Sequence, residues 1–282
     1  MVKIISDIGY CYGVKHAISV LKKAKDEVKH VYLTHPLIHN KSENQNLMDE
    51  NNASILNGEN PTEEDGILFS AHGHGKEEET PYLGKTKLFD ATCPLIISRY
   101  QAIEKAREHG DFCYFLGKKN HQETIGFLKN FPFLIFLDVG KDLIEQLSHY
   151  PKGKKYGLIP QTTISNDVFQ QARTLLKNIG ELTFEMPICS RYYGRVRQSI
   201  EFLKTVDCKT SACLVLGDIS SSNARELKNA IQAQFPDLYV QIALSMDDIE
   251  RNRLKGKDIY LTSATSCPEE KVLSMKLSLE SL

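Results

Sequence analysis

The sequence predicts an α/β protein made of three similar domains. Short apolar runs rich in β-branched and aromatic residues alternate with helical stretches, and three cysteines stand at comparable places, each before a predicted helix. Such alternation is typical of parallel sheets whose strands are joined by crossover helices. A chain of 282 residues with 41% hydrophobic side chains exceeds the usual span of one compact domain and has ample material for several cores.

The predicted strands are short and mostly apolar. The chain begins with VKIIS at 2–6, continues through a helical stretch at 13–28 and returns to a strand, HVYLT, at 30–34. The later strands are GILFSA at 66–71, DFCYFLG at 111–117, YGLIP at 156–160, ACLVLG at 212–217 and DIYLT at 258–262. No low-complexity segment or long Pro/Gly-rich linker separates them, so we expect the domains to be tightly apposed.

Three cysteines mark an internal repeat. They are Cys11 in GYCYGVKHAI, Cys93 in DATCPLIISRY and Cys189 in PICSRYYGRV. A first polar cluster follows each cysteine after 28, 28 and 32 residues, at His39, His121 and Ser221. A second polar cluster follows after 61, 69 and 77 residues, at His72, Thr162 and Ser266. The repeat is one of layout, since the three stretches are not identical in sequence.

The repeat has a geometric consequence. In open α/β sheets, ligands bind outside the carboxyl ends of the strands. Three such domains facing one another, in a pseudo-threefold or trefoil arrangement, would bring the cysteines and the polar clusters to one centre. The expected domains are 12–92 with Cys11 at its start, 93–187 and 188–268, and the segments 1–11 and 269–282 are expected to pack on the core as a terminal strand and helix.

Composition excludes several classes of function. The 35 basic and 36 acidic residues give a net charge of −1, so no overall field attracts nucleic acid or an anionic membrane. The N-terminus lacks a signal peptide and no stretch approaches 18 apolar residues, which predicts a cytoplasmic protein. Seven cysteines without a C-x-x-C pair argue against a disulfide framework. No long amphipathic seam remains, so we expect a monomer.

Three converging thiolates favour an iron–sulfur cluster. Soft thiolate ligands select such clusters, zinc or copper(I), and three cysteines on a four-iron cluster leave one iron open as a Lewis acid. The alternative is that the three cysteines are unrelated buried fillers, because cysteine is among the most buried residue types. That alternative fits the cysteines on apolar strands or helix edges better: Cys113, Cys208 and Cys213.

The polar clusters share hydrogen-bonding side chains suited to phosphate oxygens. They are His39, His72, His121, Thr162, Ser221, Ser222, Asn223 and Ser266. Glu123 is the carboxylate among them, which in a site for a phosphorylated ligand indicates a proton donor. Structural alternatives exist: DISSSNARE is also typical of a turn and helix N-cap, and GKKNHQE is also typical of a surface loop.

These stretches, taken together, resemble a known family. GYCYGVKHAI, HPLIHN, FSAHG, DATCPL, NHQETIG, QTTIS, PIC, SSN and TSATSCPEE occur in this order along almost the whole chain. They resemble the LytB-type 4-hydroxy-3-methylbut-2-enyl diphosphate reductases, iron–sulfur enzymes of three α/β domains that catalyse the last step of the non-mevalonate isoprenoid pathway. The stretch CSRYYGRVRQ after Cys189 is bulkier and more basic than is usual in that family.

The resemblance implies a site and a reaction. It makes Cys11, Cys93 and Cys189 the ligands of a [4Fe–4S] cluster with one open iron. It places Glu123, as proton donor, and Thr162 near the substrate hydroxyl, with the other polar residues around the diphosphate. The implied reaction is reductive dehydroxylation of the allylic diphosphate to isopentenyl and dimethylallyl diphosphates with two electrons and two protons. A flavodoxin or ferredoxin is the implied electron donor.

Three other functions stay open from the sequence. A divergent paralogue would act on another small phosphorylated allylic alcohol, and an assay of the anaerobic enzyme with the allylic diphosphate distinguishes it. A non-catalytic iron–sulfur sensor is less consistent with Glu123 and Thr162, because a sensor needs no proton donor. A cysteine hydrolase would be active without iron and in air.

Overall fold

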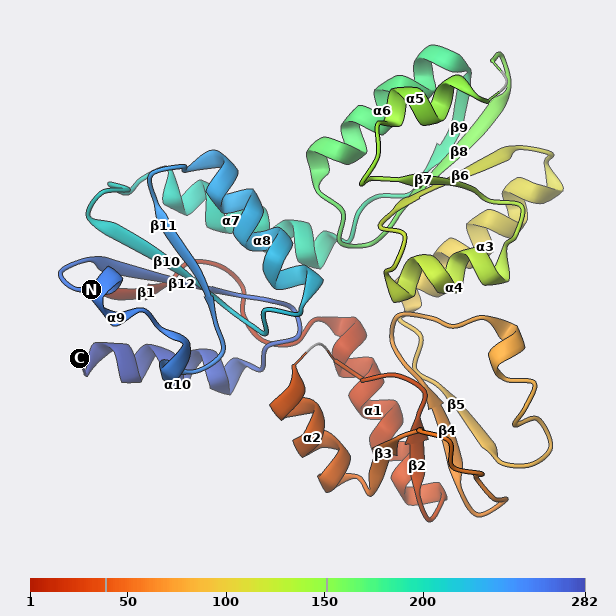
Figure 1. The fold of residues 1–282 in the computed structure, drawn as a ribbon, viewed down its shortest axis with the longest axis horizontal. Coiled ribbons are helices and arrows are strands. Elements are labelled where there is room, and N and C mark those ends of the chain that lie inside the picture. Colours follow the sequence, from red (N-terminus) through yellow and green to blue (C-terminus); the bar gives the residue numbers. More distant parts are fainter. Residues whose placement is uncertain (39, 151, 282) are drawn as a thin grey trace. The chain divides into compact units, whose positions relative to one another are not determined.

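The computed structural model describes residues 1–38, 40–150 and 152–281. Within them lie three four-stranded sheets in which every strand pairing is parallel (Figure 1). The predicted α/β class with three similar sheets is therefore confirmed. The chain divides into two compact units. Unit 1 comprises Met1–Val14, Ile38–Gln45 and Ser190–Leu282, and unit 2 comprises Lys15–Leu37 and Asn46–Cys189.

The first sheet belongs to unit 2 and has the order β3-β2-β4-β5. Its strands are β2 (Val31–Leu33), β3 (Ala53–Ile55), β4 (Gly66–Phe69) and β5 (Lys87–Asp90). The helices of this region are α1 (Tyr12–Glu27), α2 (Lys41–Glu50) and a short 3₁₀ helix (Lys76–Glu78). Helix α1 begins and ends within one residue of the helix that the sequence predicts.

The second sheet also belongs to unit 2 and has the order β7-β6-β8-β9. Its strands are β6 (Phe112–Gly117), β7 (Ile135–Asp138), β8 (Lys155–Pro160) and β9 (Glu181–Glu185). Its helices are α3 (Pro94–Glu108), α4 (Gln122–Asn130), α5 (Leu143–Ser148) and α6 (Asn166–Ile179). Pro94 opens α3, a position where the missing N–H costs nothing.

The third sheet belongs to unit 1 and has the order β1-β12-β10-β11. Its strands are β10 (Ser211–Leu216), β11 (Tyr239–Ala243), β12 (Asp258–Ser263) and the N-terminal strand β1 (Val2–Ile4). Its helices are α7 (Ser190–Leu203), α8 (Ser222–Gln234), a 3₁₀ helix (Met246–Asp248), α9 (Arg251–Leu254) and α10 (Glu269–Glu280).

All three sheets have one topology. In each, the first strand of the repeat pairs with the second on one side and the third on the other, and the fourth strand pairs with the third. The fourth strand of the third sheet is β1, so the N-terminus of the chain completes its last repeat. A cysteine segment follows the fourth strand each time: Cys93 follows β5, Cys189 follows β9 and Cys11 follows β1.

The core of the second sheet shows why its strands are apolar on both faces. On β6, Cys113 and Phe115 face one hydrophobic cluster with α3 and α4, and Tyr114 and Leu116 face another with α5 and α6. Successive residues of a strand point to opposite faces, so a strand covered on both sides needs a continuous apolar run. This is the pattern by which β6 is visible in the sequence.

Edge strands are less visible in the sequence. In the part of the chain that the structure describes, the sheets have six interior and six edge strands. All six interior strands are predicted from the sequence, but five edge strands are not: β3, β5, β7, β9 and β11. Strand β9, for example, alternates between exposed and partly buried residues. An edge strand with one solvated side lacks the apolar run that marks an interior strand.

The boundaries 12–92, 93–187 and 188–268 stay a prediction. Among the described residues, no helix combines the length and the hydropathy that a membrane-spanning segment needs.

Candidate active site

The sheet topology places the two polar clusters of a repeat beside each other. The first cluster follows the first strand and the second follows the third, and these strands are direct neighbours: β6 with β8 and β10 with β12. Between them the strand order reverses, which is where open α/β sheets bind ligands. At the end of β6, a methyl group on Gly117 would lie 2.7 Å from Thr124 Oγ1, so the turn into α4 is tightly closed.

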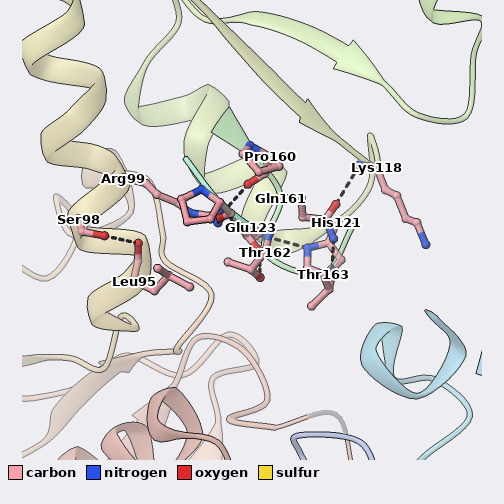
Figure 2. A network of polar contacts seen from close by, with 11 residues as sticks. Leu95, Ser98, Arg99, Lys118, His121, Glu123, Pro160, Gln161, Thr162 and Thr163 are labelled. Carbon is pink, nitrogen blue, oxygen red and sulfur yellow. Dashed lines mark hydrogen bonds and ion pairs between the residues drawn. The ribbon is translucent and has the colours of Figure 1, made fainter. Parts of the chain in front are cut away.

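Glu123 is the centre of the polar network in unit 2 (Figure 2). Its carboxyl group is 1% exposed and lies in the first turn of α4. Oε1 accepts hydrogen bonds from the Thr162 backbone N–H, at 2.8 Å, and from Arg99 Nη1, at 3.3 Å. Oε2 lies 2.6 Å from Thr162 Oγ1, which donates to it. The structure thus joins Glu123 and Thr162, the two residues that the sequence predicts at the reacting end of the substrate.

The surroundings of Glu123 favour a protonated carboxyl group. Burial raises the pKa of Glu123 above its ordinary value, because desolvation disfavours the charged form. The charge of Arg99 and the hydrogen bonds from Thr162 act in the opposite direction. A carboxyl group whose pKa is raised in this way suits a general acid.

His121 caps helix α4 next to this carboxyl group. Its Nδ1 accepts the backbone N–H of Glu123 at 3.2 Å, so neutral His121 carries its proton on Nε2 and can donate there. The His121 and His72 rings meet edge to face, with centroids 6.1 Å apart. The structure therefore brings together the predicted residues His72, His121, Glu123 and Thr162.

The predicted polar residues of unit 1 gather at the start of helix α8. Ser221 is the N-cap and its Oγ accepts the Ala224 N–H at 3.4 Å. The same Oγ lies 3.5 Å from Ser266 Oγ, and Asn223 Nδ2 donates to Thr265 Oγ1 at 2.6 Å. A helix N-terminus lined with hydroxyl groups is suited to an anion, because its first backbone N–H groups point outward.

Two side chains at this helix terminus have unused hydrogen-bonding atoms. Ser222 Oγ and Asn223 Oδ1 are buried, and neither has a hydrogen-bond partner among the described residues. Buried polar atoms without partners are rare in native proteins and need an explanation. A ligand with several hydrogen-bonding oxygens would provide one. His39, the remaining predicted residue of the diphosphate site, lies outside the described residues.

The three predicted cluster cysteines have equivalent backbone positions. Each lies directly before a helix: Cys11 before α1, Cys93 before α3 and Cys189 before α7. The N–H groups of Cys93 and Cys189 donate to Ala71 O and Thr162 O, both at 3.0 Å. The N–H of Cys11 donates to Thr265 O at 3.2 Å. Each acceptor lies at, or one residue before, a second polar cluster.

Three of the other four cysteines are more deeply buried than these three. All seven cysteines are described, and none forms a disulfide. Burial raises the pKa of Cys113 to about 11 and the pKa values of Cys213 and Cys267 to about 12, so these thiols are inert. Cys11, Cys93 and Cys189 are partly buried, as is Cys208. Accessible thiols at helix N-termini are more suitable ligands than thiols enclosed in a core.

The donor set fits an iron–sulfur cluster chemically. Two of its cysteines, Cys93 and Cys189, belong to unit 2, and both interact electrostatically with the buried guanidinium of Arg99, whose Nε has no acceptor among the described residues. A buried cation with an unused donor beside two thiols suits an anionic thiolate-bound group. Within the described ranges, no three or more His, Cys, Asp or Glu side chains are already gathered as a metal site.

Sequence reasoning missed two arginines. Arg99 and Arg195 are buried, and each lies six residues after a predicted cluster cysteine, Cys93 or Cys189. This common spacing was the available signal. Arginine is mostly exposed in proteins, so the residue type alone does not indicate a buried role.

Comparison with known proteins identifies the family. The sequence model of the family described as LytB protein matches residues 2–280. The chain belongs to the LytB family. This confirms the resemblance seen in the sequence, and the family is one of iron–sulfur oxidoreductases.

Two bacterial relatives match over nearly their whole length. The 4-hydroxy-3-methylbut-2-enyl diphosphate reductase of Dictyoglomus turgidum is 29% identical over 99% of this chain and 96% of its own. The Clostridioides difficile enzyme of the same name is 28% identical over 100% and 99%. The structure of the E-1-hydroxy-2-methyl-but-2-enyl-4-diphosphate reductase from Plasmodium falciparum matches with a TM-score of 0.85 and 25% identity, covering 100% of this chain and 88% of that one.

Proposed function

We propose that this LytB-family chain reduces (E)-4-hydroxy-3-methylbut-2-enyl diphosphate to isopentenyl and dimethylallyl diphosphates, removing the hydroxyl group as water. The observation that carries the proposal is the contact chain from Glu123 to Thr162 to Cys189. The buried carboxyl group of Glu123 accepts from the hydroxyl group and the backbone N–H of Thr162, and the backbone carbonyl of Thr162 accepts the backbone N–H of Cys189, a predicted cluster ligand. Proton donation beside a redox cluster is what reductive dehydroxylation requires.

Glu123 would supply the proton for the departing hydroxyl group. Hydroxide is a poor leaving group, so protonation of the C–O oxygen lowers the barrier to its departure. Oε1 accepts two N–H donors, so Oε2 is the oxygen available to carry the transferable proton. Protonated Oε2 would donate to Thr162 Oγ1, whose own proton then becomes available to the substrate.

The three cysteines Cys11, Cys93 and Cys189 would hold a [4Fe–4S] cluster with one open iron. When bound, this group would pass the two electrons from the external donor one at a time and would provide a Lewis acid for the allylic oxygen. The chain's own residues would orient the diphosphate, keep water from the reacting carbon and deliver protons. A flavodoxin or ferredoxin would deliver the electrons, and the enzyme would act as a cytoplasmic monomer.

The diphosphate would be held by hydrogen-bond donors from several segments of the chain. The hydroxyl groups of Ser221, Ser222 and Ser266, the Asn223 amide and the N-terminus of α8 provide one part. His72 and His121 provide another, together with His39. The predicted set contains no lysine or arginine, so affinity would rest on hydrogen bonds and the helix dipole.

An anaerobic assay tests the proposed function. The reconstituted enzyme is given reduced flavodoxin, or dithionite with a viologen mediator, and the allylic diphosphate. Formation of both C5 diphosphates, with a substrate-induced change in the EPR spectrum of the reduced cluster, is the expected result. If a cluster forms but the substrate neither turns over nor changes the spectrum, another allylic phosphate or a sensor role replaces this proposal.

Ser222→Ala should separate ligand affinity from stability. Removing a buried hydroxyl group that has no partner should leave the free energy of unfolding unchanged or raise it by up to about 1 kcal/mol. The same change should weaken diphosphate binding by about two- to tenfold, since one neutral hydrogen bond contributes roughly 0.5–1.5 kcal/mol. Thermal unfolding and isothermal titration calorimetry with a diphosphate substrate analogue measure the two effects.

Ser165→Ala is the matched control, because it removes the N-cap of α6, outside the predicted diphosphate residues, and should destabilise the protein by about 1 kcal/mol without weakening diphosphate binding. Equal affinity in the wild type and Ser222→Ala would place the diphosphate elsewhere.

A further inference from the structure

Arg99 connects two parts of the candidate site that are far apart in the sequence. Its side chain is 0% exposed on helix α3. Nη1 donates to Glu123 Oε1, at 3.3 Å, and to the carbonyl of Pro160. Nη2 donates to the carbonyl of Pro187 at 2.6 Å. Figure 2 shows the guanidinium between the end of β8 and the carboxyl group of Glu123.

Arg195 makes an equivalent set of backbone contacts in unit 1. Nη1 donates to Ser263 O at 3.1 Å and Ala264 O at 2.9 Å, and Nη2 donates to the carbonyl of Gly9. Pro160 and Ser263 are the last residues of β8 and β12, which are corresponding strands. Each arginine therefore joins the end of a third strand to a peptide near a cysteine.

The second peptide has a fixed place in the repeat. Pro187 lies two residues before Cys189, and Gly9 lies two residues before Cys11. An arginine guanidinium is planar and has five donors, so it can fix several carbonyl groups at once where a lysine cannot. The backbone leading into both cysteines is thus held by a buried side chain located six residues after another cysteine.

One contact distinguishes the two arginines. Arg99 also donates to a carboxyl group, whereas Arg195 donates to backbone carbonyl groups and to the Ser263 hydroxyl. The pair Arg99–Glu123 is fully buried, so solvent screens the charge of the guanidinium very little.

We propose that Arg99 is a positioning residue that fixes Glu123 and the peptide leading to Cys189 in one rigid arrangement and holds Glu123 as an acid that can release its proton. The proposal rests on the proposed function. Because Arg99 occupies Oε1, it directs the transferable proton to Oε2 and hence to Thr162. Because it is positively charged, it offsets part of the effect of burial, which would otherwise make Glu123 too weak an acid.

A pH titration reports on Glu123 only if the groups around it keep their charge in the same pH range. Arg99 and Tyr100 face it from α3, and His121 precedes it at the start of α4. Burial raises the pKa of Tyr100 to about 12, so Tyr100 stays neutral in the working range. Arginine stays protonated in proteins. Neither Tyr100 nor Arg99 therefore changes its charge in the working pH range, and the titration of the buried carboxyl group is assigned to Glu123.

Arg99→Met should move this titration upward. An acid catalyst is active while protonated, so activity is present at low pH and lost as pH rises through its pKa. The charge of Arg99 lowers the pKa of Glu123, so removing Arg99 raises that pKa. The basic limb of the kcat profile should therefore move to higher pH by about one pH unit or more, since a nearby opposite charge shifts a carboxyl pKa by roughly 1–3 units. Turnover on the plateau should fall about tenfold or more, because Glu123 and the Cys189 segment are less well oriented.

Infrared titration of the holoenzyme gives a readout that needs no substrate. The C=O band of a protonated carboxyl group that Glu123→Gln abolishes should disappear at a higher pH in Arg99→Met than in the wild type. Arg99→Lys keeps the charge and should raise the pH at which the band disappears by less than Arg99→Met does. If Arg99→Met does not fold, Arg99→Lys replaces it as the test variant. Arg195→Met is the matched control, and it should leave the titration of this band unchanged.

The outcomes separate this proposal from the proposed function. If the pH at which the band disappears is unchanged in both Arg99 variants, or rises equally in Arg195→Met, the proposed role of Arg99 is wrong. If the band disappears at a higher pH but the allylic diphosphate is not turned over, Arg99 does act on Glu123, and the proposed substrate is wrong. In a Glu123→Gln background, Arg99→Met should produce no shift of the basic limb, because the group it acts on is gone.

Discussion

Glu123→Gln is expected to lower kcat by about 10²–10⁴-fold, the usual contribution of a positioned general acid. Glutamine keeps the shape of the side chain and can still accept at Oε1 from Thr162 and Arg99, but it cannot release a proton. The KM for the allylic diphosphate should change little, because Glu123 belongs to the reacting end and not to the predicted diphosphate residues. Single-turnover kinetics with the reduced enzyme measure the loss at the chemical step.

The same substitution should change how stability depends on pH. The pKa of Glu123 is raised in the folded protein, so its contribution to stability is present below the ordinary pKa of glutamate and is lost as pH rises through the raised value. Glutamine does not titrate, so Glu123→Gln does not lose stability in this way as pH rises. The melting temperature of the variant, relative to the wild type, should therefore increase from acidic to neutral pH.

Glu185→Gln is the control for both effects. Glu185 lies at the end of β9 in the second sheet, and its side chain pairs with Arg173 at the surface. It should retain near-normal turnover and show no comparable pH effect, since exposed ion pairs contribute little. Full turnover in Glu123→Gln would show that the proton comes from another group, such as the diphosphate itself.

Cys93→Ser is expected to have the second large effect. Cys93 is the N-cap of α3 and its N–H is already bonded to Ala71 O, so serine should preserve the backbone and the fold. A serine hydroxyl is a much poorer ligand for iron than a thiolate. Iron per chain and turnover should each fall about tenfold or more after anaerobic reconstitution, while the circular dichroism spectrum keeps its helical signal.

Cys208→Ser is the matched control, because Cys208 is another partly buried thiol of this chain. Its iron content and EPR spectrum should equal those of the wild type. Cys11→Ser and Cys189→Ser should behave as Cys93→Ser does. If any of the three retains full iron and turnover, that cysteine is not a ligand and the proposed three-cysteine cluster is wrong.

The sequence alone reveals the candidate site where function requires particular residue types at regular intervals. Cys93 and His121 are recognisable because cysteines and polar clusters recur at similar intervals along the chain, and Glu123 is recognisable as the carboxylate two residues after His121. The spacing of cysteines and polar clusters also predicts that Thr162 and Glu123 belong to one site, and the structure joins them through two hydrogen bonds. These are properties of local sequence and of strand order.

For residues that act through distant backbone groups, the sequence does not show which groups they bind. Arg99 binds carbonyl groups 61 and 88 residues away, and a carbonyl group belongs to every residue type, so no sequence pattern records the pairing. Arg195 reaches back to Gly9 in the same way. CSRYYGRVRQ therefore stands out in the sequence only as a basic stretch, although its Arg195 is buried.

By itself, the sequence determined the α/β class, the interior strands and the residue types available for catalysis, because burial on both faces and site chemistry each demand specific side chains. The tertiary structure decided which strands form the edges, that β1 completes the third sheet, and which buried cation lies beside Glu123. The first two features depend on main-chain hydrogen bonds between segments distant in sequence, which are nearly independent of side-chain identity. The third depends on how helices α3 and α4 pack, which brings the two side chains together.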